Sequence, residues 1–105
     1  MDFKKSEVRK EMVKKYKNID IGQEAPSTQH YFYLNNGKKL KNIAELMESL
    51  KDMDQDLFSF HVNEQNNDFS SWIRDVFGEK ELARRISHAR FPTSMLKSIE
   101  KYIQK

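Results

Sequence analysis

The sequence lacks cysteine and has little glycine or proline. Its 105 residues include no cysteine, three glycines and two prolines. Without thiols the chain can form no disulfide, iron–sulfur cluster or cysteine-ligated zinc site, which fits a reducing compartment. Gly22, Gly37 and Gly78 stand singly, so no glycine-rich loop is present to cradle a phosphate.

Long hydrophobic runs are also missing. The longest bulky run covers residues 31–34, and no apolar stretch follows the charged residues at the start of the chain. A bilayer span or a secretory signal needs a much longer run. We therefore expect a cytoplasmic protein without a membrane partner, built as one domain with terminal appendages.

Charge divides the chain into three parts. Residues 1–41 carry ten Lys or Arg and five Asp or Glu, residues 42–81 carry three and ten, and residues 82–105 carry six and one. Basic ends therefore flank an acidic middle. The ends can fold against the acidic centre, or they can present a basic face to a polyanion.

Residues 67–78 have the strongest helical pattern. Asn67 or Asp68 can cap the first turn, and Gly78 supplies a left-handed stop. The apolar residues between them recur at the spacing of one helix face and include the single tryptophan. We expect the core to form around this face, which carries Phe69, Trp72, Ile73, Val76 and Phe77.

Residues 30–41 carry the clearest β signal. Aromatic strand formers precede Asn36-Gly37, the preferred centre of a type I′ hairpin turn. That turn would place Tyr33 opposite Leu40. A lone hairpin is unstable in water, so it must lie on helices.

Helical patterns occupy most of the remaining chain. Asn42 and Asp54 are placed to cap two helices, although residues 58–62 in the second also alternate like a strand. Residues 4–17 predict a basic helix with a narrow apolar stripe, and residues 22–28 predict a linker.

The last third of the chain predicts two more helices. Residues 82–90 form the first, which ends in arginines and is broken by Pro92. Thr93 or Ser94 can start the second. The predicted fold is mainly α (α+β), a small bundle of short helices with one β-hairpin. Residues 1–28 would be a basic N-terminal helix and linker, 29–90 the hairpin-plus-helices core domain, and 91–105 a C-terminal helix packing on the core.

A signature runs through the middle of the chain. It consists of His61-Val62-Asn63, then Asn67-Asp68-Phe69, then the run Trp-Ile-Arg-Asp-Val-Phe-Gly from Trp72 to Gly78. With this signature, residues 31–86 resemble a family of small domains of unknown function. These domains occur chiefly in archaeal genomes, alone or attached to other domains. The resemblance implies domain boundaries and no particular activity.

Polar residues gather in the sequence around the start of the central helix. If the short helix before it meets the central helix, His61 can bond Asp68 or a loop carbonyl in a capping cluster. The same residues could instead form a recognition pocket for a peptide or small ligand. The candidate interaction residues are His61, Asn63, Asn67, Asp68 and Arg74.

Signs of metal binding and catalysis are absent. His30, His61 and His88 are scattered, and none pairs with another at the helical spacing of zinc ligands. No serine sits in a nucleophile elbow, and the carboxylates occupy helix starts and solvent faces. We expect no cofactor, no metal and no enzymatic activity.

A protein-interaction module is the function that remains most plausible from the sequence. An acidic belt could dock a basic partner, and it comprises Glu45, Glu48, Asp52, Asp54 and Asp56. Attachment to other domains in the family also fits an adaptor. The alternative is a nucleic-acid-binding or nucleoprotein-associated protein, with Tyr31 and Tyr33 available to stack on bases. Its phosphate contacts would be Lys10, Lys14, Lys15, Lys38, Lys39, Lys41, Arg84, Arg85 and Arg90.

Overall fold

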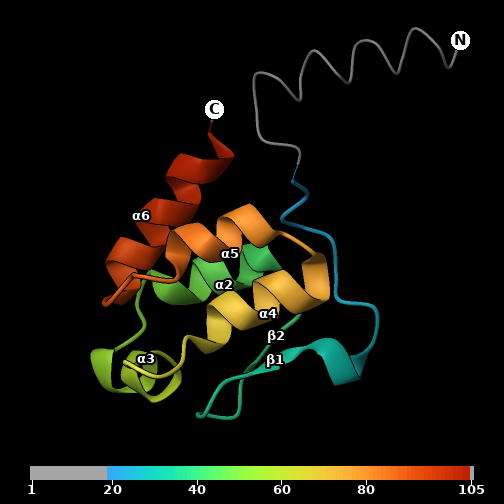
Figure 1. Ribbon diagram of the computed structural model, residues 1–105. Coiled ribbons are helices and arrows are strands. Elements are labelled where there is room, and N and C mark those ends of the chain that lie inside the picture. Colours follow the sequence, from blue (N-terminus) through green and yellow to red (C-terminus); the bar gives the residue numbers. More distant parts are fainter. Residues whose placement is uncertain (1–18, 105) are drawn as a thin grey trace, which may run out of the picture.

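The computed structural model describes residues 19–104 (Figure 1). A short 3₁₀ turn, η1, at Thr28–His30 precedes a hairpin of two strands, β1 (Phe32–Tyr33) and β2 (Lys39–Leu40). Five helices follow, namely α2 (Ile43–Leu50), α3 (Gln55–His61), α4 (Asp68–Phe77), α5 (Lys80–Ile86) and α6 (Pro92–Ile103). The predicted fold class, mainly α with one β-hairpin, is confirmed. The helix predicted at residues 4–17, with Lys10, Lys14 and Lys15, lies outside the described residues.

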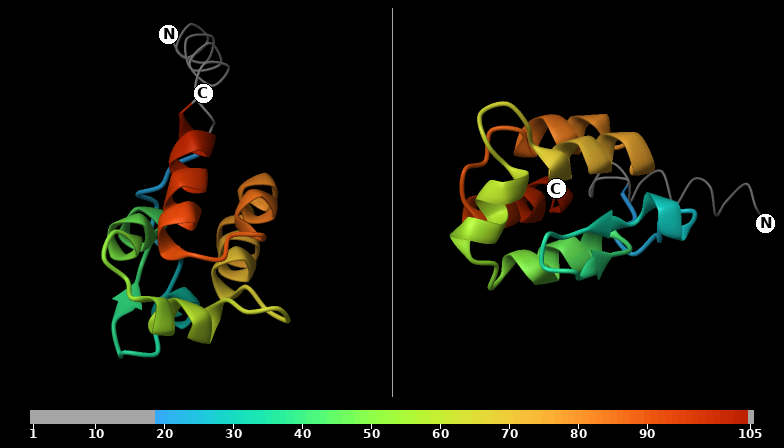
Figure 2. Two further views of the ribbon diagram at one scale, coloured as in Figure 1. Left: turned by 90° about the vertical axis from the view of Figure 1, so that its left-hand side faces the viewer. Right: turned by 90° about the horizontal axis from the view of Figure 1, so that it is seen from below.

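The helices surround one hydrophobic core. α4 packs against α5, α5 against α6 and α6 against α2, while the hairpin contacts α2 through β2 (Figures 1 and 2). Every element from β1 to α6 contributes buried apolar side chains. No helix within residues 19–104 has the length and apolar character needed to cross a membrane.

Helix α4 lies at the centre of this packing. Asn67 caps it by accepting the Ser70 N–H at 2.9 Å, and Gly78 ends it with a φ of 69°. Phe69, Trp72 and Ile73 are buried, as predicted, whereas Val76 and Phe77 are only half-buried at the edge of the core. The indole of Trp72 is 7% exposed, and its N–H donates to the His30 carbonyl at 2.7 Å. A hydrogen bond at the polar end of the indole allows this large side chain to be buried at little cost.

The hairpin register differs from the prediction. Phe32 pairs with Leu40, and Tyr33 pairs with Lys39, so the predicted pairing of Tyr33 with Leu40 is wrong. With this register the loop has three residues, 35–37, and within it the Gly37 N–H donates to the Leu34 carbonyl at 2.9 Å. Gly37 is also its only positive-φ residue, at 92°.

This geometry is a type I turn followed by a left-handed glycine, the usual form of a three-residue hairpin loop. The register has a clear physical basis. Phe32, Leu34 and Leu40 all face the core and are buried, while Tyr33 is 54% exposed. A shift of one residue would turn one strand's apolar side chains to solvent.

Helices α2 and α3 begin as predicted, whereas α5 and α6 differ from the prediction in their bounds. Asn42 and Asp54 accept the N–H groups of Glu45 and Leu57, both at 2.8 Å. α3 is helical through His61, so the competing strand pattern is not realised.

The first difference is that α5 begins at Lys80 and ends at Ile86, which leaves Arg90 in the connection to α6. The second is that α6 begins at Pro92 instead of Thr93 or Ser94. Proline is favoured at a first helical position because its missing N–H would have no partner there.

Residues 19–25 lie along the junction of β2 and α2. The Ala44 N–H donates to the Ile21 carbonyl and the Ala25 N–H to the Lys41 carbonyl, both at 2.8 Å. Ala25 is buried. Part of the predicted linker therefore packs directly on the core.

Candidate interaction site

The loop between α3 and α4, residues 63–66, is ordered by its own hydrogen bonds. Val62 and Asn67 form a β-bridge at its base, and the Asn63 N–H donates to the Asn66 carbonyl at 2.8 Å. The Asn63 side-chain oxygen accepts the N–H groups of Gln65 and Asn66 at 3.0 and 3.1 Å. This is an Asx turn, in which a side chain takes the place of a backbone acceptor. The side-chain amide groups of Gln65 and Asn66 remain exposed and have no hydrogen-bond partner within residues 19–104.

Asn67 and Ser70 anchor this loop to α5. Besides capping α4, Asn67 donates its amide to the Ile86 carbonyl at 3.0 Å. The buried Ser70 hydroxyl donates to the Ala83 carbonyl at 2.7 Å. Both side chains thus use their polar atoms within the fold, which gives them a structural role.

His61 occupies the other side of the α4 start. Its Nδ1 lies 3.2 Å from an Asp68 carboxylate oxygen, and its Nε2 accepts the Asn35 N–H at 3.0 Å. The hydrogen bond predicted between His61 and Asp68 is therefore present. His61 is 5% exposed and lies against the rings of Phe32 and Phe69. It links the hairpin, α3 and α4.

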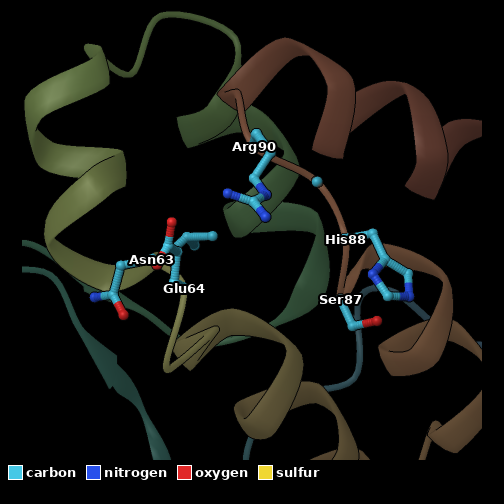
Figure 3. A pocket seen from close by; sticks show the side chains of 7 residues that line it. Asn63, Glu64, Ser87, His88 and Arg90 are labelled. Carbon is cyan, nitrogen blue, oxygen red and sulfur yellow. The ribbon is translucent and has the colours of Figure 1, made fainter.

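Two polar hollows adjoin the loop and share Asn63, Glu64 and Ser87. The first, of about 260 Å³, extends along α4. The second, of about 320 Å³, lies between the loop and the α5–α6 connection. In Figure 3 the Arg90 side chain enters the second hollow from that connection, and Asn63 and Glu64 come from the opposite side. Arg90 makes no ion pair with any described residue.

The structure divides the five predicted interaction residues into two groups. Asn63, Asn67 and Arg74 line the first hollow. His61 and Asp68 line neither hollow and form the hydrogen-bonded support behind the loop. The predicted interaction residues did not include Glu64 and His88, which line the hollows, and Arg90 was predicted as a phosphate contact. No local pattern could have shown this, because residues 63–64 and 87–90 meet only through the packing of α4 on α5.

Two of the predicted phosphate contacts, Arg84 and Arg85, are already paired. Arg85 bonds the Glu81 carboxylate at 3.1 Å, and Arg84 bonds the same group. These hydrogen bonds lower the pKa of Glu81 to about 2. Arg74, one of the predicted interaction residues, pairs with Asp75 at 2.9 Å, and this hydrogen bond raises the Arg74 pKa.

The hairpin lysines lie beside acidic groups. A hollow of about 470 Å³ between β2 and α2 is lined by Lys38 and Lys39 together with carboxylates of the predicted acidic belt, Glu45, Glu48 and Asp52. Asp54 caps α3, and Glu48 pairs with Lys51 at 3.1 Å. Asp56 is exposed in the first turn of α3. The belt and the lysines thus form one surface of mixed charge.

The described residues contain no group of three or more His, Asp or Glu side chains arranged to hold a metal ion. His30 contacts the Ser27 hydroxyl at 2.9 Å, His61 contacts Asp68, and His88 is exposed beside the second hollow.

The fold and this site define a small helical domain with a hairpin and an ordered polar loop. The chain belongs to the family of unknown function DUF5752, whose model matches residues 26–102. This match extends beyond the resemblance seen at residues 31–86 and includes most of α6. No curated protein and no solved structure matches the chain. The archaeal distribution and the signature stay predictions.

Proposed function

We propose that the protein is a cytoplasmic, non-enzymatic interaction module that binds a protein partner through residues 63–66 and the two adjoining hollows. The observation that carries this proposal is a loop held by its own hydrogen bonds while the side chains at its tip have no partner among the described residues. A loop that is ordered before binding loses little conformational entropy when a partner arrives.

The chemistry of the hollows favours a polar segment of protein over a small apolar ligand. Their walls supply amide, hydroxyl, carboxylate and guanidinium groups, with Val62 and Ala89 as the apolar members. Small-molecule sites are mostly apolar and enclose their ligand. Exposed amides and an unpaired arginine suit the backbone and acidic side chains of another protein.

Site-specific cross-linking tests the proposal. A photoreactive residue at position 66 should give a protein adduct in native lysate that survives nuclease treatment. The matched control is the same residue at Lys101, which is exposed on α6 and lines neither hollow. Arg90→Ala should reduce the adduct, whereas Lys97→Ala, which removes a cation elsewhere on the surface, should not. Equal adducts from positions 66 and 101 would contradict the proposal.

A second candidate, nucleic-acid binding, is favoured by one feature of the hairpin. The corrected register places the exposed Tyr33 opposite Lys39, and Lys38, Lys39 and Lys41 make no ion pair within residues 19–104. An exposed ring beside free lysines can stack on a base and neutralise phosphates. The carboxylates across the same hollow oppose this function.

Filter binding to single-stranded DNA and RNA over a salt series separates the two candidates. If the hairpin binds phosphates, changing Lys38, Lys39 and Lys41 to Gln should make the plot of log binding constant against log salt concentration less steep. The slope should fall by roughly one for each phosphate that is no longer neutralised. A control with Lys80, Lys97 and Lys101 changed to Gln removes the same charge from other surfaces. Absence of binding at low salt would remove this candidate.

A further inference from the structure

The second feature that suggests a role is the buried ring of His61. Its two nitrogens contact different elements, Asn35 in the hairpin loop and Asp68 in the first turn of α4. Phe32 and Phe69 lie against the ring, with centroids 5.0 and 5.5 Å away. The ring is therefore shielded from water and connects the hairpin to α4.

These contacts determine where the ring carries its proton. The Asn35 backbone N–H can only donate, so Nε2 must keep its lone pair. The proton of the neutral ring then lies on Nδ1 and is donated to the Asp68 carboxylate. Both contacts are satisfied only in this tautomer.

Protonation affects the two contacts in opposite directions. A proton on Nε2 would face the Asn35 N–H, which places two donors against each other and leaves the amide without its acceptor. The added charge is stabilised at Nδ1 by Asp68, which is 3.2 Å away. Among the described residues that contact the ring from the hairpin and α4, Asp68 alone is titratable.

We infer that His61 is a proton-operated latch. The neutral ring holds the hairpin loop through Asn35, and protonation at Nε2 releases that loop while the ring stays bound to Asp68. The hairpin is sensitive to this change because each of its strands has only two residues. The latch acts on the hairpin and is independent of what binds the 63–66 loop.

NMR of the full-length, ¹⁵N-labelled protein tests the latch during a titration from pH 8 to pH 5. At high pH the His61 ring should show a protonated Nδ1 and an unprotonated Nε2. As His61 takes up its proton, the Asn35 and Gly37 amides should lose protection against hydrogen exchange, relative to their intrinsic rates. The loss should be roughly 5- to 100-fold, as expected when one buried donor loses its acceptor. His30 and His88 serve as internal references whose titration should leave these amides unchanged.

Two substitutions sharpen the test. Asn35→Pro removes the donor N–H at a turn position that favours proline, so the Gly37 amide should lose its dependence on His61 protonation. Asp68→Asn changes the Nδ1 contact and leaves the Nε2 contact with Asn35 in place, so loss of Gly37 protection should still accompany protonation of Nε2. The latch is refuted if wild-type Nε2 carries the proton at pH 8, or if Asn35 and Gly37 keep their protection throughout the His61 titration.

Discussion

Asn67 offers a quantitative test of how the α3–α4 loop is held. Its side chain accepts the Ser70 N–H at 2.9 Å and donates to the Ile86 carbonyl at 3.0 Å. Loss of an asparagine cap costs about 1 kcal/mol. The Ile86 carbonyl also accepts the Ala89 N–H at 3.1 Å, so it keeps a partner, and the second bond contributes about 1 kcal/mol. Asn67→Ala should therefore lower the free energy of unfolding by about 2 kcal/mol.

Urea unfolding followed by the fluorescence of Trp72 and by circular dichroism measures this change. In a domain of this size, about 2 kcal/mol corresponds to a fall in Tm of roughly 8–15 °C. Asn67→Ser keeps an oxygen for the cap and loses the side-chain amide that donates to the Ile86 carbonyl, so it should cost about half as much. Asn66→Ala is the matched control, because its exposed side chain has no partner among the described residues, and it should stay within about 0.5 kcal/mol of wild type. The reasoning fails if Asn67→Ala is no less stable than Asn66→Ala.

Three further changes test other parts of the fold. Trp72 should resist quenching by iodide in the native state, and Trp72→Ala should cost about 3–5 kcal/mol in urea unfolding, because the indole is 7% exposed and hydrogen-bonded. Gly78→Ala should cost about 1–2 kcal/mol because φ is 69° there, whereas Gly22→Ala should be nearly neutral, since its added carbon would come no closer than 3.5 Å to a neighbour. The low pKa of Glu81, about 2 against a usual 4.5, adds stability above pH 4.5 that is lost as the pH falls toward 2. In Glu81→Gln the free energy of unfolding should therefore fall less steeply as the pH is lowered from 4.5 toward 2. An unchanged dependence on pH would contradict the ion pairs with Arg84 and Arg85.

The sequence predicted those features that depend on a few neighbouring residues. Helix starts at Asn42, Asp54 and Asn67 follow from a side-chain oxygen placed before an apolar periodic run, and each cap is present. The stop at Gly78 is equally local, because glycine alone adopts a positive φ without strain.

The hairpin register could not be predicted in the same way. Asn36-Gly37 is compatible with a two-residue turn and with the three-residue loop that forms. The choice depends on which side chains the core takes up, and the burial of Phe32 and Leu40 decides it. The second hollow could not be predicted from the sequence either, because residues 87–90 approach Asn63 only when α4 and α5 have packed together.

Around the start of α4, some residues use their polar atoms in hydrogen bonds within the fold, and others leave them free to bind a partner. Asn67 and Ser70 fix this start to α5 with hydrogen bonds that do not involve His61. Release of the hairpin by His61 protonation would therefore leave residues 63–66 in place, because their own bonds and the anchor on α5 remain. The hairpin loop and the 63–66 loop can consequently change independently of each other. Protection of the Gln65 and Asn66 backbone amides against hydrogen exchange, relative to their intrinsic rates, should then stay constant between pH 8 and pH 5 while hydrogen exchange in the hairpin increases.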